Sequence, residues 1–126
     1  MDTHELDKDR PHLLIGLAVL VLIVSIIPIP EFIGTGANRR SVSLVFHLIG
    51  YALLALIAQP IVASHIKRAR WQVAIITVGG ITGYGVLIEL LQAPIPYRTS
   101  SIIDVAINAI GAIIGVVTGQ QFSKRV

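Results

Sequence analysis

The sequence contains no cysteine, which excludes disulfide bonds and thiolate chemistry. It is also poor in charge, because Asp, Glu, Lys and Arg make up only 13% of its 126 residues. By contrast, 54% of the residues are hydrophobic and the mean hydropathy is +0.80. Soluble domains carry about 25% charged residues, so this composition argues against a soluble domain and predicts a membrane protein.

Nucleic-acid binding is not predicted, although the net charge is +3. The basic residues lie at the ends of apolar segments and do not form a patch interleaved with aromatic residues. The four histidines are scattered and show no finger-like ligand spacing. We therefore expect no cofactor and no nucleic-acid partner, and take the lipid bilayer as the main partner.

Four apolar segments are each close to the length of about 20 residues that crosses a hydrocarbon core. The linkers between them are short, so consecutive segments should form antiparallel hairpins. The predicted fold is therefore an all-α polytopic membrane protein, with four transmembrane helices in a compact bundle of two antiparallel hairpins. The segments are Leu13–Pro30, Val42–Ile66, Trp71–Gln92 and Ile102–Phe122.

These segments form one predicted domain, residues 13–122, between an N-terminal tail (1–12) and a C-terminal tail (123–126). A cleaved signal peptide is not favoured, because the leader is rich in acids and no Ala-x-Ala follows the first apolar run. Pro28 and Pro30 should end the first helix and Pro60 should kink the second, since proline lacks the backbone N–H that a helix interior uses.

The Lys and Arg residues of the tails and loops predict the orientation in the membrane. Seven on one side against three on the other place both termini in the cytoplasm of a cell-membrane protein. The first side holds Lys8, Arg10, Lys67, Arg68, Arg70, Lys124 and Arg125, and the second holds Arg39, Arg40 and Arg98.

Several polar residues inside the apolar segments should lie at one depth. Helices that alternate in direction bring the start of the second, the end of the third and the start of the fourth to the same membrane face. At 1.5 Å per residue, His47, Glu89 and Asp104 lie roughly 5 to 7 Å below that face, with Tyr51 and Asn108 about one turn deeper. Helical spacing also groups these residues in three inward-facing stripes. The stripes are His47 and Tyr51; Gly85, Glu89 and Gln92; and Asp104, Asn108, Gly111, Gly115 and Gly119.

The glycines favour close helix packing, because small residues let membrane helices approach each other. Gly111, Gly115 and Gly119 form one such run, and Gly79 and Gly83 form a shorter one. The Gly-rich faces are also candidates for contact with a second copy of the chain.

The buried carboxylates permit more than one interpretation. An ionisable residue within a membrane segment is costly and is by default a candidate functional site. One alternative is that both acids lie near enough to the surface to reach water. Another is a structural network in which Arg98 pairs with Glu89 or Asp104, and Asn108 and Gln92 satisfy the remaining groups.

The ordered set of these residues resembles the VanZ-like family of small integral membrane proteins, over roughly residues 43–119. The residues that carry the resemblance are His47, Tyr51, Glu89, Gln92, Arg98, Asp104, Asn108, Gly111 and Gly115. The resemblance implies a link to low-level resistance to teicoplanin, a lipoglycopeptide. The family commonly has an Asp-Lys pair just before its histidine, where this chain has Ser43-Leu44. The acids here would then be balanced by Arg98, His47 or the nearby Arg39 and Arg40.

Three functions remain open on the sequence. The first is a site on the outer face that binds or handles an amphiphilic molecule, such as a lipid-like compound or a lipoglycopeptide. The second is an intramembrane enzyme in which Glu89 or Asp104 acts as acid or base with His47, or in which these three residues hold a metal ion. The third is a structural or partner-binding bundle. The sequence does not name the ligand.

Overall fold

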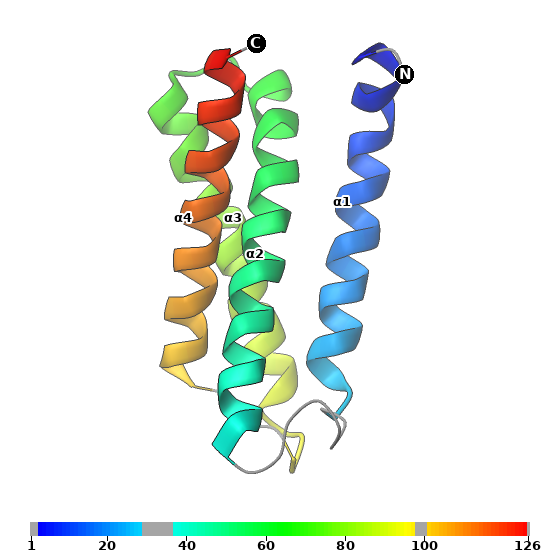
Figure 1. The fold of residues 1–126 in the computed structure, drawn as a ribbon, viewed down its shortest axis with the longest axis vertical. Helices are drawn as coiled ribbons and strands as arrows, with labels where there is room; N and C mark the ends of the chain where they lie inside the picture. The colour runs from blue at the N-terminus through cyan, green and yellow to red at the C-terminus, as the bar shows by residue number, and fades with distance from the viewer. Residues whose placement is uncertain (1–2, 29–36, 98–100, 126) are drawn as a thin grey trace.

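The computed structural model describes residues 3–28, 37–97 and 101–125. These ranges contain helices α1 (Thr3–Ile26), α2 (Ala37–His65), α3 (Arg70–Gln92) and α4 (Ile102–Arg125). Figure 1 shows that α2 and α4 run in one direction and α1 and α3 in the other. All four helices are long and apolar enough to cross a membrane. The protein is therefore an all-helical, multi-pass membrane protein, as the sequence predicted.

Three of the four helices extend beyond the apolar segments that the sequence predicted. The third helix is predicted to within one residue, but α1 begins at Thr3, so three turns of helix precede the predicted start at Leu13. The apolar part of α1 nevertheless begins only at Lys8. α1 ends two residues before Pro28, whereas α2 continues through Pro60 to His65. Pro30 lies outside the described residues. Hydropathy reports the part of a helix that suits lipid, whereas the helical backbone extends into its polar ends.

The closest helix contact is a parallel seam between α2 and α4, made by the glycine run of α4. A Cβ atom on Gly111 would lie 2.6 Å from the backbone oxygen of Leu48, and one on Gly115 would come even closer to the oxygen of Ala52. Gly119 meets the side chain of Gln59 in the same way. Any larger residue at Gly111 or Gly115 would collide with helix backbone, so these glycines set the spacing of the two helices.

The core beside this seam is built from small side chains. Ala55, Ala112 and Val116 are almost completely buried, and residues of α3 such as Val78 pack against them. The other predicted glycine pair is different, because Cβ atoms on Gly79 and Gly83 would meet nothing within 4 Å. Both residues face outward from α3, so this pair makes no close helix contact within the described residues, and contact with a second copy of the chain stays a prediction.

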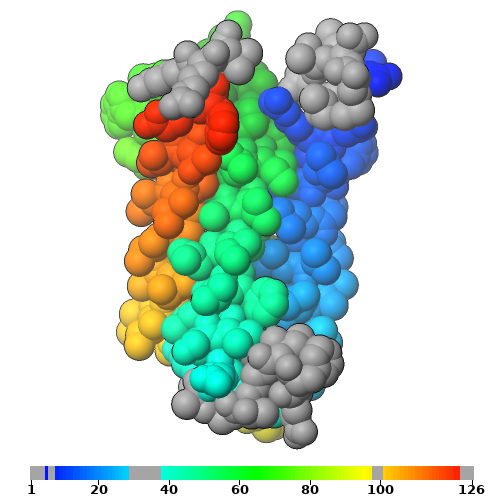
Figure 2. Space-filling view, in the orientation of Figure 1, coloured from blue at the N-terminus to red at the C-terminus, as the bar shows by residue number. Residues whose placement is uncertain are grey.

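α1 lies at the edge of the bundle and is mostly exposed (Figures 1 and 2). Ser25 is its buried residue in the part that the structure describes. Side chains from α3 and the turn after it attach α1 by donating hydrogen bonds to its backbone oxygens. Tyr84 donates to Ala18 at 2.6 Å, Gln92 donates to Ser25, and Tyr97 donates to Ile26 at 2.9 Å. The last two acceptors belong to the final turn of α1, whose carbonyls lack partners within the helix.

Candidate functional site

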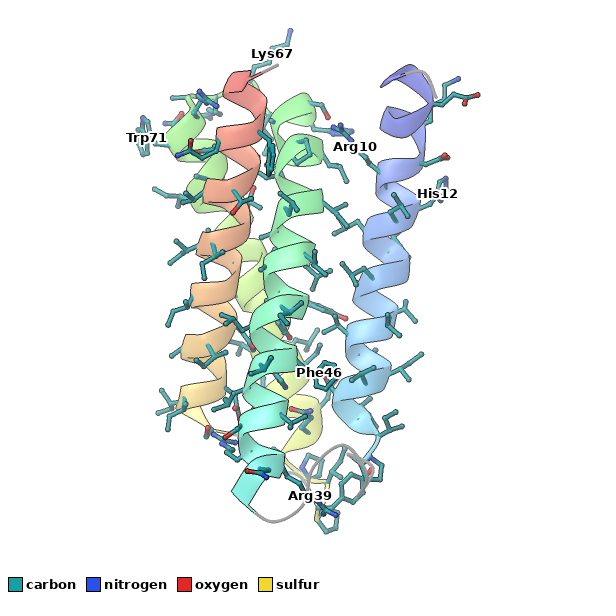
Figure 3. All side chains as sticks on the ribbon, viewed as in Figure 1. Arg10, His12, Arg39, Phe46, Lys67 and Trp71 are labelled. Atoms are coloured by element: carbon teal, nitrogen blue, oxygen red, sulfur yellow. The ribbon has the colours of Figure 1, made fainter. Side chains whose placement is uncertain are left out.

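The candidate site lies at the end of the bundle where α2 and α4 begin and α1 and α3 end, which we call the polar end. Figure 3 shows Arg39 at this end, and Arg10, Lys67 and Trp71 at the opposite end. Because α2 and α4 both start here, polar residues in their first turns come together. The site is described from the surface of the polar end inward.

The outermost part of the site is an ion pair between α2 and α4. The Arg40 guanidinium lies 3.3 Å from Oδ2 of Asp104, and its other terminal nitrogen donates to the Ser101 hydroxyl at 2.7 Å. Ser101 directly precedes α4, and its hydroxyl accepts the backbone N–H of Asp104, as residues at a helix N-cap do. Asp104 is 4% exposed, whereas the Arg40 side chain is 39% exposed. One charge is therefore enclosed and its partner still reaches the surface.

A second polar pair, His47 and Asn108, lies deeper on the same two helices. The His47 Nδ1 atom is 3.0 Å from Oδ1 of Asn108. An amide oxygen only accepts hydrogen bonds, so with this amide orientation Nδ1 carries the proton and a neutral ring leaves Nε2 as an acceptor. A Cβ atom on Gly85 of α3 would lie only 2.7 Å from Nδ2 of Asn108. Glycine at this position therefore makes room for the buried amide.

Two tyrosine rings continue from His47 toward the centre of the bundle. The rings of His47 and Tyr51 are stacked at 6.0 Å, and those of Tyr51 and Tyr84 lie 6.4 Å apart at a tilt of 41°. Tyr51 is completely buried, and its hydroxyl has no hydrogen-bond partner among the described residues. An unpartnered hydroxyl in an apolar interior is destabilising, so packing alone does not explain the choice of tyrosine here.

α3 contributes Glu89 and Gln92 to the site. Both are buried and lie on the same face of the helix as Gly85. Glu89 lies close enough to Tyr51 for the two side chains to interact electrostatically. Gln92 uses its amide to hold the end of α1. The third helix thus places an acid beside the aromatic series and a donor beside α1.

The structure buries six of the seven residues that the sequence singled out, between the polar end and the middle of the bundle: His47, Tyr51, Glu89, Gln92, Asp104 and Asn108. Arg98 lies outside the described residues. The cation observed beside Asp104 is Arg40, which the sequence offered only as one of several ways to balance the acids. Its position seven residues before His47, two helical turns on the same face, was the signal that could have placed it first. The sequence pattern did not indicate that Ser101 would bind Arg40 and Asp104.

The proposed metal site is not supported. Among the described residues, no group of three His, Asp or Glu side chains is arranged to hold a metal ion. Asp104 instead pairs with Arg40 and His47 with Asn108. The three residues share a region but not a common coordination point.

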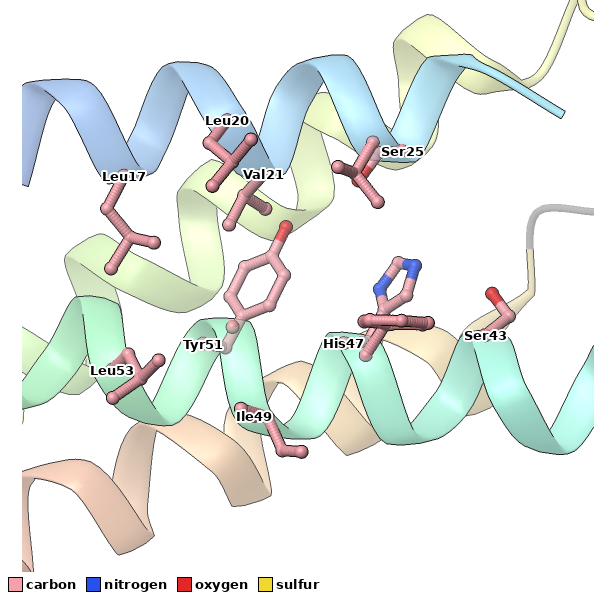
Figure 4. A pocket seen from close by; sticks show the side chains of 12 residues that line it. Leu17, Leu20, Val21, Ser25, Ser43, His47, Ile49, Tyr51 and Leu53 are labelled. Atoms are coloured by element: carbon pink, nitrogen blue, oxygen red, sulfur yellow. The ribbon is translucent and has the colours of Figure 1, made fainter. Parts of the chain in front are cut away.

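A groove of about 230 Å³ runs between α1 and α2 and reaches the site. Figure 4 shows His47 and Tyr51 beside it, with Leu17, Leu20 and Val21 across from them on α1. Ser25, Ser43 and His47 lie toward one end of the groove, whereas the rest of its lining is almost entirely apolar. The buried polar site is therefore connected to the lipid-facing side of the bundle.

Comparison with known proteins places the chain in a family. No curated protein sequence and no solved structure matches it significantly. The family model described as VanZ/LLP1 matches residues 13–120, which include all of α2 and α3, most of α1 and α4, and every residue of the polar site. The predicted resemblance is thus confirmed, and the chain belongs to the VanZ/LLP1 family.

Proposed function

We propose that this protein binds an amphiphilic molecule at the polar end, with the head against the buried polar residues and the tail on the lipid side. The observation that carries this proposal is that His47 and Tyr51 belong to the buried polar site and also line the groove between α1 and α2. A molecule in the bilayer could therefore reach the polar residues laterally, without crossing water. Polar residues inside a membrane segment commonly mark such sites.

The polar groups define what kind of head would fit. Arg40 offers a partly exposed cation, which suits an anionic oxygen such as that of a phosphate or carboxylate. Oδ1 of Asp104 is buried and has no hydrogen-bond partner in the described part of the chain, so it suits a donor such as a hydroxyl or an ammonium group. A head that carries both an anionic oxygen and a donor would satisfy both residues.

The distribution of basic residues supports a site on the outer face of the cell membrane. Seven Lys and Arg residues flank the opposite end and three flank the polar end, which by the positive-inside rule puts both termini in the cytoplasm. An outward site suits a link to teicoplanin-type resistance, because that lipidated drug acts outside the cytoplasm. Cysteine introduced at Ala69 should stay unlabelled by an impermeant thiol reagent in intact cells, whereas cysteine at Thr35 should react; the reverse result would overturn the orientation.

Lipid retention and drug susceptibility test the binding proposal. The protein is purified in mild detergent, and the lipids that remain bound are identified by mass spectrometry, beside teicoplanin susceptibility of a sensitive host that expresses the chain. His47→Phe, which removes the hydrogen bond to Asn108, should lose most retained lipid and any resistance. His12→Phe is the matched control, because His12 is exposed at the opposite end. Equal retention by both variants would count against the site.

A second candidate function is acid–base catalysis on a bound amphiphile. The observation that favours it is the contact between His47 Nδ1 and Oδ1 of Asn108, which orients the ring and, in a neutral imidazole, leaves Nε2 as a proton acceptor. A base held in one orientation by a second side chain is common in catalytic sites. Incubation with the retained lipid, followed by mass spectrometry, separates the two functions, because catalysis yields a product of altered mass and binding returns the lipid unchanged.

A further inference from the structure

The groove between α1 and α2 offers more than an entrance to the polar end. Its lining runs from Ser43 to Leu53 on α2, which spans about 15 Å along the helix axis. The α1 wall opposite is formed largely by Leu17, Leu20 and Val21. A water molecule needs two to four polar partners, and apart from Ser25 at one end, this wall presents none in its side chains. The chemistry of the lining therefore suits hydrocarbon.

The exposed rim of the groove indicates that a hydrocarbon in it would come from the lipid bilayer. Apolar side chains at its rim are exposed, with Leu20 54% and Ile49 53% accessible. Both helices cross the membrane by length and composition, so these rims face lipid chains. The groove is thus an indentation in the lipid-facing surface that ends beside a buried polar site.

Gly50 lies on the α2 wall of the groove, where α1 comes close. A Cβ atom at this position would lie 3.3 Å from Cγ2 of Val21 on α1. A branched side chain there would fill the space between the two helices. The adjoining Tyr51 hydroxyl, buried and without a hydrogen-bond partner among the described residues, indicates that α1 and α2 do not form a fully complementary interface here. Few direct contacts hold α1, so a guest in the groove would disturb little packing.

We infer that this groove holds one acyl chain of a membrane phospholipid whose headgroup occupies the polar end. The inference rests on the proposed function and adds to it the class of ligand and the path of its tail. The volume of about 230 Å³ is lined along α2 from Ser43 to Leu53, which suits a single linear chain. Gly50 is then the residue that determines whether a chain can enter.

Photolabelling with two phosphatidylethanolamine probes tests the inference. One probe carries a diazirine at the middle of an acyl chain, and the other carries it on the headgroup. After irradiation of the full-length protein in lipid nanodiscs, labelled peptides are located by mass spectrometry. The chain probe should label the groove residues of α1 and α2 at least fivefold more than Ile75 and Ile113, which are 63% and 50% exposed on α3 and α4. The headgroup probe should label the polar end around Ser43.

Matched variants show whether the groove itself is responsible. Gly50→Leu should reduce groove labelling by the chain probe severalfold. Gly80→Leu makes the same change on the exposed face of α3, where a Cβ atom meets nothing within 4 Å, and should leave labelling unchanged. Uniform labelling by the chain probe, with the headgroup probe still at the polar end, would overturn the acyl-chain inference alone. Loss of specific labelling by both probes would overturn the proposed function and this inference together.

Discussion

The two sides of α2 differ in how they meet their neighbours. Toward α4, glycine lets the backbones approach so closely that a Cβ atom on Gly111 would collide with Leu48. Toward α1, the helices leave a groove of about 230 Å³, and α1 is held partly by hydrogen bonds that α3 donates to its backbone. The first contact fixes the polar residues of α2 and α4 relative to each other. The second leaves room for another molecule beside them.

The difference shows that two neighbours of α2 have separate roles. The contact with α4 fixes the geometry of the polar residues, whereas the position of α1 determines whether another molecule can reach them. His47 and Asn108 face each other across the tight seam, so their geometry does not depend on α1. Access to His47 depends on the groove and therefore on α1. A binding site in lipid needs both properties, because a rigid polar site that no molecule can reach would only stabilise the fold.

The largest expected effect comes from replacing a glycine of the tight seam between α2 and α4 with a larger residue. Gly115→Leu places a branched side chain against the backbone of Ala52, which cannot rotate away. We expect a loss of about 3 kcal/mol or more in stability, or failure to fold. Gly80→Leu should change stability by less than about 0.5 kcal/mol, because that position is open. Thermal unfolding of both variants in the same detergent checks this contrast, and similar stabilities would mean that the seam is not tightly packed.

The ion pair at the polar end should respond unequally to removal of its two partners. Arg40→Gln leaves the carboxylate of Asp104, which is 4% exposed, without its cation. We expect a loss of about 2 kcal/mol, below the usual value for a fully buried pair because Arg40 itself is partly exposed. Asp104→Asn leaves a guanidinium that can turn toward water, and should lose only about 1 kcal/mol. Denaturant unfolding measures both losses, and a larger loss for Asp104→Asn would contradict the assigned burial.

Part of this arrangement was predictable from the sequence. Helical spacing and alternating direction placed His47, Glu89, Asp104 and Asn108 near one end of the bundle, because these rules depend only on residue counting. The stripe from Asp104 to Gly119 faces α2 as one surface for the same reason.

The remainder depended on tertiary structure. The apolar part of α1 has no polar stripe that would show which face packs, so neither its position at the edge nor the groove beside it could be predicted. Asp104 pairs with Arg40 because the first turns of α2 and α4 lie side by side, and hydropathy does not show which of several nearby cations lies against the acid. Gly79 and Gly83 carry the same spacing as Gly111 and Gly115, yet only the second pair contacts another helix of the chain. Spacing identifies a surface fit for packing, but not its partner.

The smallest expected effect separates two tyrosines that differ in their hydrogen bonds. Tyr84→Phe removes a hydrogen bond to the backbone of α1 and should cost about 0.6 kcal/mol, the average for such bonds in membrane bundles. Tyr51→Phe removes a hydroxyl with no partner in the described part of the chain, so the delipidated protein should lose no stability and could gain some. Paired melting curves of delipidated protein compare them. Destabilisation by Tyr51→Phe would show that its hydroxyl makes a stabilising contact.

Neutralising the buried acids tests most directly whether the polar end is a binding site or only a structural network. Glu89→Gln and Asp104→Asn preserve size and hydrogen-bonding capacity but remove the charge. Retained lipid and thermal stability are measured on the same purified samples. We predict that both variants fold and that at least Glu89→Gln, which changes the acid beside Tyr51, retains several-fold less lipid than the unmodified chain and confers no teicoplanin resistance. Two well-folded variants with unchanged lipid content, or the collapse of both proteins, would contradict a binding role and leave the cluster a structural one.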